Sequence, residues 1–129
     1  SFENIWRCIE AYVRHYCDNP MKFSVVFDME HSRIGKFTIP KELTKEFALQ
    51  PRVALIHFRS LREYLEPRGF SPHEVTTIND ISSSYLHGKI SFYLHRHTPE
   101  SIEQFLTELR EGYRFLLRVD EEAPDQGGA

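Results

Sequence analysis

The first seventeen residues show apolar side chains at steps of three and four. The apolar positions are Phe2, Ile5, Trp6, Ile9, Tyr12, Val13 and Tyr16. This spacing places them on one side of an α-helix whose other side is polar. Asp18-Asn19-Pro20 follows, and proline disfavours the helical conformation in the residue before it. The pattern therefore predicts an amphipathic helix over residues 1–17.

After this helix the spacing of the apolar positions changes to two. Apolar and polar side chains alternate over residues 23–29 and again over 34–39, with a polar turn at 30–33 between them. Such alternation is typical of strands that bury one face, so the two segments are predicted to form an antiparallel hairpin. Pro40 has no N–H for a sheet and ends the hairpin. Residues 41–49 are predicted to form a short helix.

The middle of the chain cannot be assigned from spacing alone. Residues 52–58 form a short apolar run, and their β-branched and aromatic side chains favour a third strand. Residues 59–66 have the pattern of a helix or a turn. Pro67-Arg68-Gly69 then interrupts the chain.

Ser71-Pro72 is typical of a helix start, because serine caps the first turn and proline fits the first helical position. A short helix over residues 73–81 is predicted to follow. The four residues 75–78 are all β-branched, so a strand remains an alternative for this segment.

The last third of the chain predicts one more strand and a closing helix. Residues 89–96 alternate, with Ile90, Phe92 and Leu94 on one face, and Gly88 marks a turn before them. Thr98-Pro99-Glu100 combines a capping hydroxyl, a proline and an acidic residue, which together indicate a helix start. The apolar stripe of this helix consists of Ile102, Phe105, Leu106, Leu109, Tyr113, Leu116 and Leu117.

These elements predict an α+β fold class. We expect a two-layer domain in which the N- and C-terminal amphipathic helices pack on an antiparallel sheet of about four to five strands. The domain is predicted to span residues 1–119. Residues 120–129 lack any periodicity and are rich in acidic residues and glycine, so a flexible tail is expected there.

Composition and charge narrow the class of protein. A chain of 129 residues suits one domain. Its net charge is −3, but the tail holds four acidic residues, so the predicted domain is close to neutral. That balance gives no support to a mainly electrostatic nucleic-acid binder. No apolar run reaches the roughly 18 residues of a membrane span and no signal-peptide pattern opens the chain, so no membrane contact is expected.

The two cysteines predict a reducing compartment. Cys8 and Cys17 lie nine residues apart in the first predicted helix, which separates them by roughly 13 Å along its axis and turns them to opposite faces. A disulfide needs Cα atoms within about 7 Å, so the two thiols are not expected to pair. We therefore expect a cytoplasmic protein.

No constellation of residues predicts catalysis, a metal or a cofactor. His95 and His97 are two residues apart at a predicted strand end, but a metal site needs three or four converging donors. No nucleophile elbow, phosphate-binding loop or dinucleotide fingerprint is present. The chain is expected to act without a cofactor and not as an enzyme.

Two groups of side chains are candidates for binding. Aromatic residues reach 13%, and tyrosines are favoured at protein interfaces because they bury area and keep a polar group. The candidate partner-binding residues are Tyr12, Tyr16, Tyr85, Tyr93 and Tyr113. A local basic cluster near Tyr64 and Phe70 could instead contact nucleic acid. With one residue of the hairpin, the candidates for that role are Lys36, Arg59, Arg62 and Arg68.

Some segments are similar to known families. Residues 78–81, 88–92 and 98–105, with the order of the predicted elements, resemble the type III secretion chaperone-like fold and its YbjN-type relatives. This resemblance implies a non-enzymatic dimer that binds an extended segment of another protein. Residues 33–43 and 49–51 are similar to the core of AbrB-type swapped-hairpin DNA-binding domains, although Arg52 stands where those domains have glycine.

The sequence thus favours one function and leaves an alternative. The favoured function is a non-enzymatic protein-interaction module, chaperone- or adaptor-like, that binds a partner segment as a homodimer. The alternative is a DNA-binding regulator that uses the hairpin over residues 22–43 and the basic cluster over residues 59–68.

Overall fold

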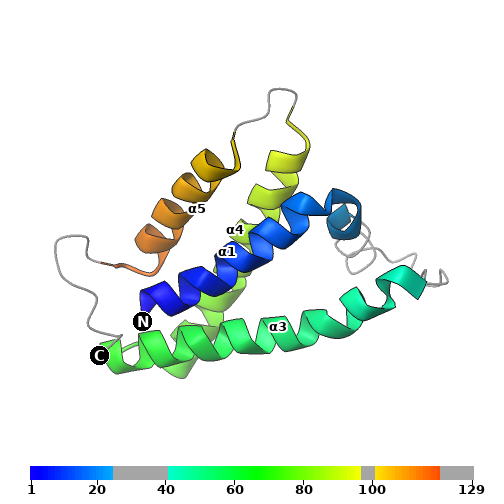
Figure 1. Ribbon diagram of the computed structural model, residues 1–129. Coiled ribbons are helices and arrows are strands. Elements are labelled where there is room, and N and C mark those ends of the chain that lie inside the picture. Colours follow the sequence, from blue (N-terminus) through cyan, green and yellow to red (C-terminus); the bar gives the residue numbers. More distant parts are fainter. Residues whose placement is uncertain (25–40, 97–100, 120–129) are drawn as a thin grey trace.

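The computed structural model describes residues 1–24, 41–96 and 101–119, and side chains are described in all of these except 41–51. Within these ranges every regular element is a helix (Figure 1). The elements are α1 (Phe2–Asp18), α3 (Lys41–Leu65), the short 3-10 helix η1 (Glu66–Arg68), α4 (Pro72–Leu94) and α5 (Ile102–Leu116). A further helical stretch begins at Pro20 and is described as far as Ser24.

The predicted α+β fold class is therefore wrong, because the described residues contain no strand and no sheet. Residues 52–58 lie inside α3, residues 89–94 form the end of α4, and residues 22–24 are helical. The rest of the predicted hairpin, residues 25–39, lies outside the described residues. The alternation at residues 89–96 misled because Ile90 is fully buried whereas Phe92 is 65% exposed, so these side chains lie on different helix faces.

The helix starts and stops that local chemistry predicted are mostly confirmed. α1 ends at Asp18, with Asn19 as its C-cap. Gly69 follows η1 with a φ of 93°, a left-handed conformation that glycine adopts without strain. Ser71 caps α4 with Pro72 in the first turn. α5 differs, because its described cap is Ser101 rather than Thr98, which lies outside the described residues.

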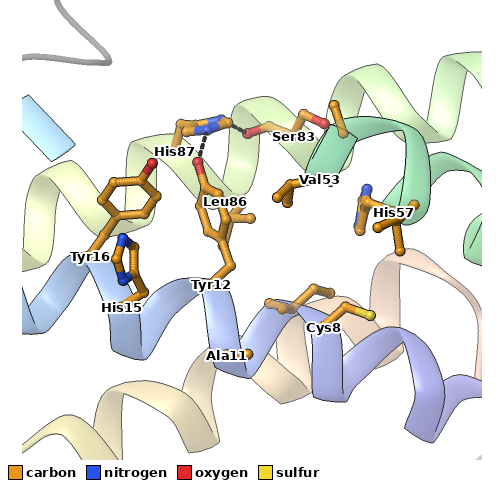
Figure 2. A pocket seen from close by; sticks show the side chains of 13 residues that line it. Cys8, Ala11, Tyr12, His15, Tyr16, Val53, His57, Ser83, Leu86 and His87 are labelled. Carbon is orange, nitrogen blue, oxygen red and sulfur yellow. Dashed lines mark hydrogen bonds between the residues drawn. The ribbon is translucent and has the colours of Figure 1, made fainter. Parts of the chain in front are cut away.

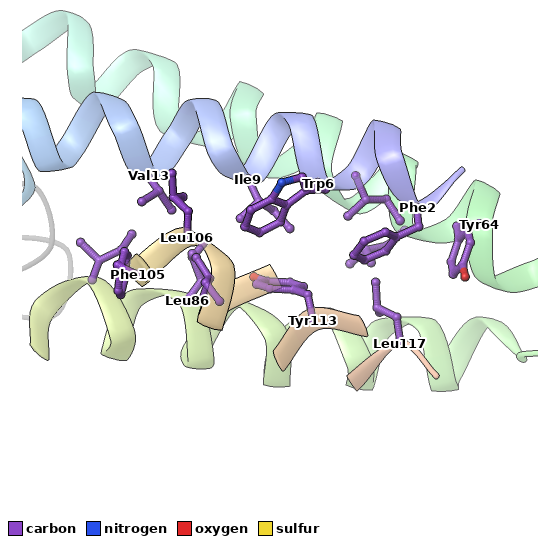
Figure 3. Close-up of a cluster of buried hydrophobic side chains, with 14 of the residues drawn as sticks. Phe2, Trp6, Ile9, Val13, Tyr64, Leu86, Phe105, Leu106, Tyr113 and Leu117 are labelled. Carbon is purple, nitrogen blue, oxygen red and sulfur yellow. The ribbon is translucent and has the colours of Figure 1, made fainter. Parts of the chain in front are cut away.

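The core lies where α1, α4 and α5 meet, with the C-terminal end of α3 closing one side (Figure 3). α4 contacts α1, α3 and α5. The buried apolar side chains are Phe2, Ile5, Trp6, Ile9, Val13, Tyr16, Phe23, Leu61, Tyr64, Leu65, Val75, Leu86, Ile90, Phe105, Leu106, Leu109, Tyr113 and Leu117. Burial of this apolar surface is the main force that holds the four long helices together.

Ion pairs and a buried hydrogen bond fix how the helices face one another. Arg14 of α1 donates to Glu103 of α5 at 2.9 Å, and Arg110 of α5 pairs with Glu3 of α1. These pairs are partly exposed, so they orient α1 against α5 more than they stabilise the fold. The Tyr113 hydroxyl of α5 donates to the Ser82 carbonyl of α4 at 3.1 Å inside the core.

The start of α4 carries a reciprocal cap whose loss is measurable. The Ser71 hydroxyl accepts from the Glu74 N–H at 3.1 Å, and the Glu74 carboxylate accepts from the Ser71 N–H at 3.0 Å. Replacing Ser71 by alanine is expected to lower the free energy of unfolding by about 1 kcal/mol, because one N–H of the first turn loses its acceptor. Urea unfolding would measure this, with Ser84→Ala on the exposed side of the same helix as the control. A loss no larger than that of the control would contradict the cap.

The same cap gives a pH dependence. The backbone N–H and the hydroxyl of Ser71 hold the pKa of Glu74 below its usual value. A carboxyl group with a lowered pKa in the folded state stabilises above its ordinary pKa, and this contribution is lost as the pH falls through the folded value. Glu74→Gln should therefore be less stable than the wild type at pH 7, and the difference should vanish well below pH 4.

Candidate functional site

A groove lies between α1 and α3. Figure 1 shows the two helices drawing apart toward the C-terminal end of α1. The space between them is an open cavity of about 440 Å³ with α4 at its base (Figure 2). We call it the α1/α3 groove. Its lining residues are Cys8, Ile9, Ala11, Tyr12, His15, Tyr16, Val53, Ala54, Ile56, His57, Ser83, Leu86 and His87.

The wall that α3 contributes is apolar and only partly covered by the rest of the described chain. Val53 is 39% exposed and Ile56 is 54% exposed, and both line the groove. Leu55 lies between them in sequence and is 49% exposed, but it does not line the groove. Large apolar side chains left open beside a concave surface are typical of binding sites.

Hydrogen bonds of His87 at the base of the groove connect α1 to α4 (Figure 2). The Tyr12 hydroxyl and His87 Nε2 are 2.8 Å apart, and His87 Nδ1 lies 2.8 Å from the Ser83 carbonyl oxygen. A carbonyl oxygen only accepts, so Nδ1 of His87 carries a proton and donates to Ser83. Phe23 stacks on His87 with ring centroids 6.2 Å apart. The contacts of His87 with Tyr12 and Phe23 therefore fix the spacing of α1 and α4 beneath the groove.

His57 contributes a neutral polar group to the α3 wall. Burial lowers the pKa of His57, the nearby His87 lowers it further, and Asn79 opposes part of this shift. Nε2 of His57 and Oδ1 of Asn79 are buried and neither has a hydrogen-bond partner among the described residues. His57 is therefore uncharged at neutral pH, and the interior of the groove suits an apolar occupant with at most a few polar atoms.

Exposed arginines lie near the groove on both α1 and α3. The α1 acids Glu3 and Glu10 lie on the side of α5, where Glu3 pairs with Arg110, and Glu10 lies 4.0 Å from Arg14, which also binds Glu103 of α5. Residues 52–62 of α3 include three arginines and no acidic residue. On α1, the exposed Arg7 precedes the groove residue Ala11 by one turn. Arginines of α1 and of residues 52–62 of α3 therefore flank the groove, with the exposed Asp18 at the C-terminal end of α1.

The five candidate tyrosines do not form one surface. Tyr12 and Tyr16 line the groove, although Tyr16 is also 2% exposed and packs in the core. Tyr113 is fully buried, with its ring centroid 5.8 Å from that of Tyr85. Tyr93 stacks on Phe105 of α5 with ring centroids 4.4 Å apart. The five tyrosines therefore mainly pack the helices together, and Tyr12 and Tyr16 also line the groove.

The residues of the alternative nucleic-acid site are spread along one helix and the turn after it. Arg59 and Arg62 are exposed on α3, with Glu63 beside them. Arg68 lies on η1, where its guanidinium lies 3.8 Å above the Tyr64 ring centroid. Lys36 lies outside the described residues. A DNA-binding role for this cluster stays a prediction.

The histidine and cysteine candidates lie apart. His95 is the C-cap of α4 and lies 2.7 Å from the Ser91 carbonyl through Nδ1, and His97 lies outside the described residues. In the described ranges no three His, Cys, Asp or Glu side chains gather closely enough to hold a metal ion. Cys8 and Cys17 are both free thiols on α1. Burial, aided by the charge of Asp18, raises the pKa of Cys17 to about 11, whereas Cys8 is exposed at the groove.

Sequence reasoning missed most of the groove. The sequence favours a strand for Val53, Ile56 and His57 and indicates no role for His87. One signal was present, because residues 53–56 are four consecutive apolar residues between Arg52 and His57, and one face of a helix cannot bury all four.

Comparison with known proteins adds no relative. No family model, no curated protein and no solved structure matches the chain. The strand order on which the resemblance to type III secretion chaperones depended is not seen in the described residues. Most of the AbrB-like segment lies outside them. None of the described helices has both the length and the apolar character needed to cross a membrane.

Proposed function

We propose that this protein is a non-enzymatic interaction module that binds an amphipathic helical segment of a partner protein in the α1/α3 groove. The observation that carries this proposal is the open cavity of about 440 Å³, walled by exposed apolar side chains of α3 and by α1. An amphipathic helix laid in an apolar groove is a common mode of peptide recognition.

The charge around the groove selects the kind of segment. Its interior is apolar and holds the neutral His57, whereas Arg7, Arg52 and Arg59 are exposed on the two helices that form its walls. An occupant with an apolar face toward α4 and acidic side chains toward the rim complements both features. Complementary charge of this kind raises the association rate and suppresses wrong partners.

Designed peptides test this selection directly. A fluorescent amphipathic peptide of leucine and glutamate is expected to bind, and a peptide with lysine in place of every glutamate is expected to bind at least about tenfold more weakly. Fluorescence anisotropy at 50 and 300 mM salt would measure both, since charge selection weakens at high salt. Equal affinity for the two peptides would contradict the role of the flanking arginines, and no binding of either would contradict the groove.

A matched pair of variants on α3 tests the site itself. Ile56→Ser is expected to weaken binding of the acidic peptide about tenfold, because it removes an apolar contact from the groove. Leu55→Ser is the control, since Leu55 has similar exposure on the same helix and does not line the groove. Both side chains are about half exposed, so both variants should keep the wild-type circular dichroism. Equal loss in the two variants would place binding elsewhere.

The same fluorescence assay can test the alternative that the arginine-rich part of α3 binds DNA. Labelled random duplex replaces the peptide, and binding that falls steeply with salt would favour that alternative. Arg59→Ala and Arg62→Ala would then weaken duplex binding, whereas Ile56→Ser would leave it unchanged.

A further inference from the structure

Three histidines line the α1/α3 groove, one from each helix that forms it. They are His15 of α1, His57 of α3 and His87 of α4. His15 is exposed, whereas Nε2 of His57 is buried and has no hydrogen-bond partner among the described residues. A buried imidazole carries a charge only where an acidic group or water stabilises it. The surroundings of His57 therefore decide whether its charged form is tolerated.

None of the described groups that face His57 is a carboxylate. On α4 these groups are Asn79, which favours the charged form of His57, and His87, which disfavours it. On α1, Figure 2 shows the Cys8 side chain at the same end of the groove. Burial is the largest influence, and it lowers the pKa of His57 because an imidazolium ion loses hydration there.

Formal charges lie close to His57 in sequence, but none of them balances it. Those within six residues of it on α3, or beside its neighbours Cys8 and Asn79, are all exposed: Arg7, Arg52, Arg59, Arg62, Glu63 and Asp80. None of them is among the described groups that shift the pKa of His57. A positive charge on His57 would therefore lie in the groove wall without a described counter-charge.

We infer that the α1/α3 groove releases an apolar occupant in acid, because His57 has to be uncharged while such an occupant covers it. This inference rests on the proposed function and adds a regulation to the same site. An apolar segment laid against Ile56 and His57 removes the remaining water from the imidazole, so the filled groove disfavours the added proton more than the empty groove does.

The sign of the pH dependence follows from this difference. The filled groove holds fewer protons than the empty one at acidic pH, so binding releases protons and the affinity rises with pH. Below the pKa of His57 in the empty groove, the affinity falls by up to about tenfold for each pH unit, the limit for one proton. Well above that pKa, His57 is uncharged in both states and the affinity does not depend on it.

Peptide binding at two pH values tests the inference. The probe is an amphipathic peptide of leucine and glutamine with blocked ends, which has no group that titrates between pH 7.5 and 5.0. Isothermal titration calorimetry is expected to show about threefold or more weaker binding to the wild type at pH 5.0 than at pH 7.5. In His57→Gln the change should be less than about 1.5-fold.

His15→Gln is the matched control. His15 lines the same groove but is exposed, so its charged form keeps its hydration and the variant should retain the wild-type pH dependence. NMR of the His57 imidazole gives a second reading in the wild type, where bound peptide should lower the pKa of His57 further. A pKa that stays the same or rises on binding would overturn the inference.

The remaining outcomes separate the inference from the proposed function. Binding that does not weaken at pH 5.0, or weakening that persists in His57→Gln, would overturn the inference and leave the proposed function standing. Release by global unfolding, seen as lost circular dichroism at pH 5.0, would overturn it as well. No binding at either pH would contradict the proposed function and the inference together.

Discussion

Tyr113→Ala is expected to lower the free energy of unfolding by about 3–5 kcal/mol, the range for removing a large aromatic side chain from a well-packed core. Tyr113 is fully buried, and its ring packs against Tyr85 while its hydroxyl reaches the Ser82 carbonyl. Truncation leaves a cavity where α1, α4 and α5 meet. Urea unfolding followed by circular dichroism would measure the loss.

Tyr113→Phe separates the ring from the hydroxyl. It keeps the packing and removes one hydrogen bond, so a loss of about 1 kcal/mol is expected. A loss in Tyr113→Ala no greater than in Tyr113→Phe would contradict the central place of this ring in the core.

The Tyr113 hydroxyl also makes the stability of the protein depend on pH in alkaline solution. Burial raises the pKa of Tyr113, and the neighbouring Tyr85 and Tyr12 raise it further. A group with a raised folded pKa stabilises fully below its unfolded value, about 10 for tyrosine, and this contribution is lost as the pH rises above it. The wild type should therefore lose stability above pH 10 more steeply than Tyr113→Phe.

Two glycines in neighbouring helices are expected to respond in opposite directions to the same substitution. Gly112→Ala should lower the free energy of unfolding by about 1–2 kcal/mol, because overpacking outweighs the gain in helix propensity. The added Cβ would lie 2.8 Å from Tyr85 Cζ and closer still to the hydroxyl oxygen, so the whole ring must shift. Tyr85 packs on Tyr113, which passes the displacement into the core.

Gly88→Ala is the matched control on α4. Its Cβ would meet nothing within 4 Å, so the helix should gain about 0.5–1 kcal/mol. Urea unfolding of both variants should be measured at low micromolar protein concentration, where self-association contributes least to the measured stability. A stabilised Gly112→Ala would contradict the close packing of α4 on α5.

The parts of the fold that the sequence predicted are those with a strong local signal. α1 and α5 each bury one face and expose the other, so their apolar side chains recur with the helical period. Ser71 and Pro72 mark a helix start through chemistry confined to one turn. Such signals depend on neighbouring residues alone, and they survived in the structure.

The central helices carry no such signal. α4 buries Val75, Ser82, Leu86 and Ile90 and also exposes Ile81 and Phe92, so apolar residues occur all around it. Without a polar face, the helical period disappears and a chance alternation at residues 89–96 reads as a strand. The β-branched residues 75–78 kept a strand as the alternative to the predicted helix over 73–81, but this segment is helical in α4, because packing against other helices overrides their local preference.

The groove was beyond prediction for a different reason. Its walls come from three helices far apart in sequence, and its width is set by the angle at which α1 and α3 separate. Tyr12 and Tyr16 were chosen for their chemistry, and they reached the groove through their place on α1. Tyr113 has the same chemistry, but its place on the apolar stripe of α5 buries it instead.

Because three helices form the groove, a ligand that binds there stabilises the folded protein against unfolding. Cys8 to Tyr16, Val53 to His57 and Ser83 to His87 come together only in the folded chain. Any occupant therefore binds the folded state and not the unfolded one, and at a concentration of 100 times its dissociation constant it adds about 2.7 kcal/mol to the unfolding free energy. The melting temperature of the unlabelled protein thus rises with ligands of every chemical class, and a search for the natural partner can begin from a mixed library of peptides and small molecules.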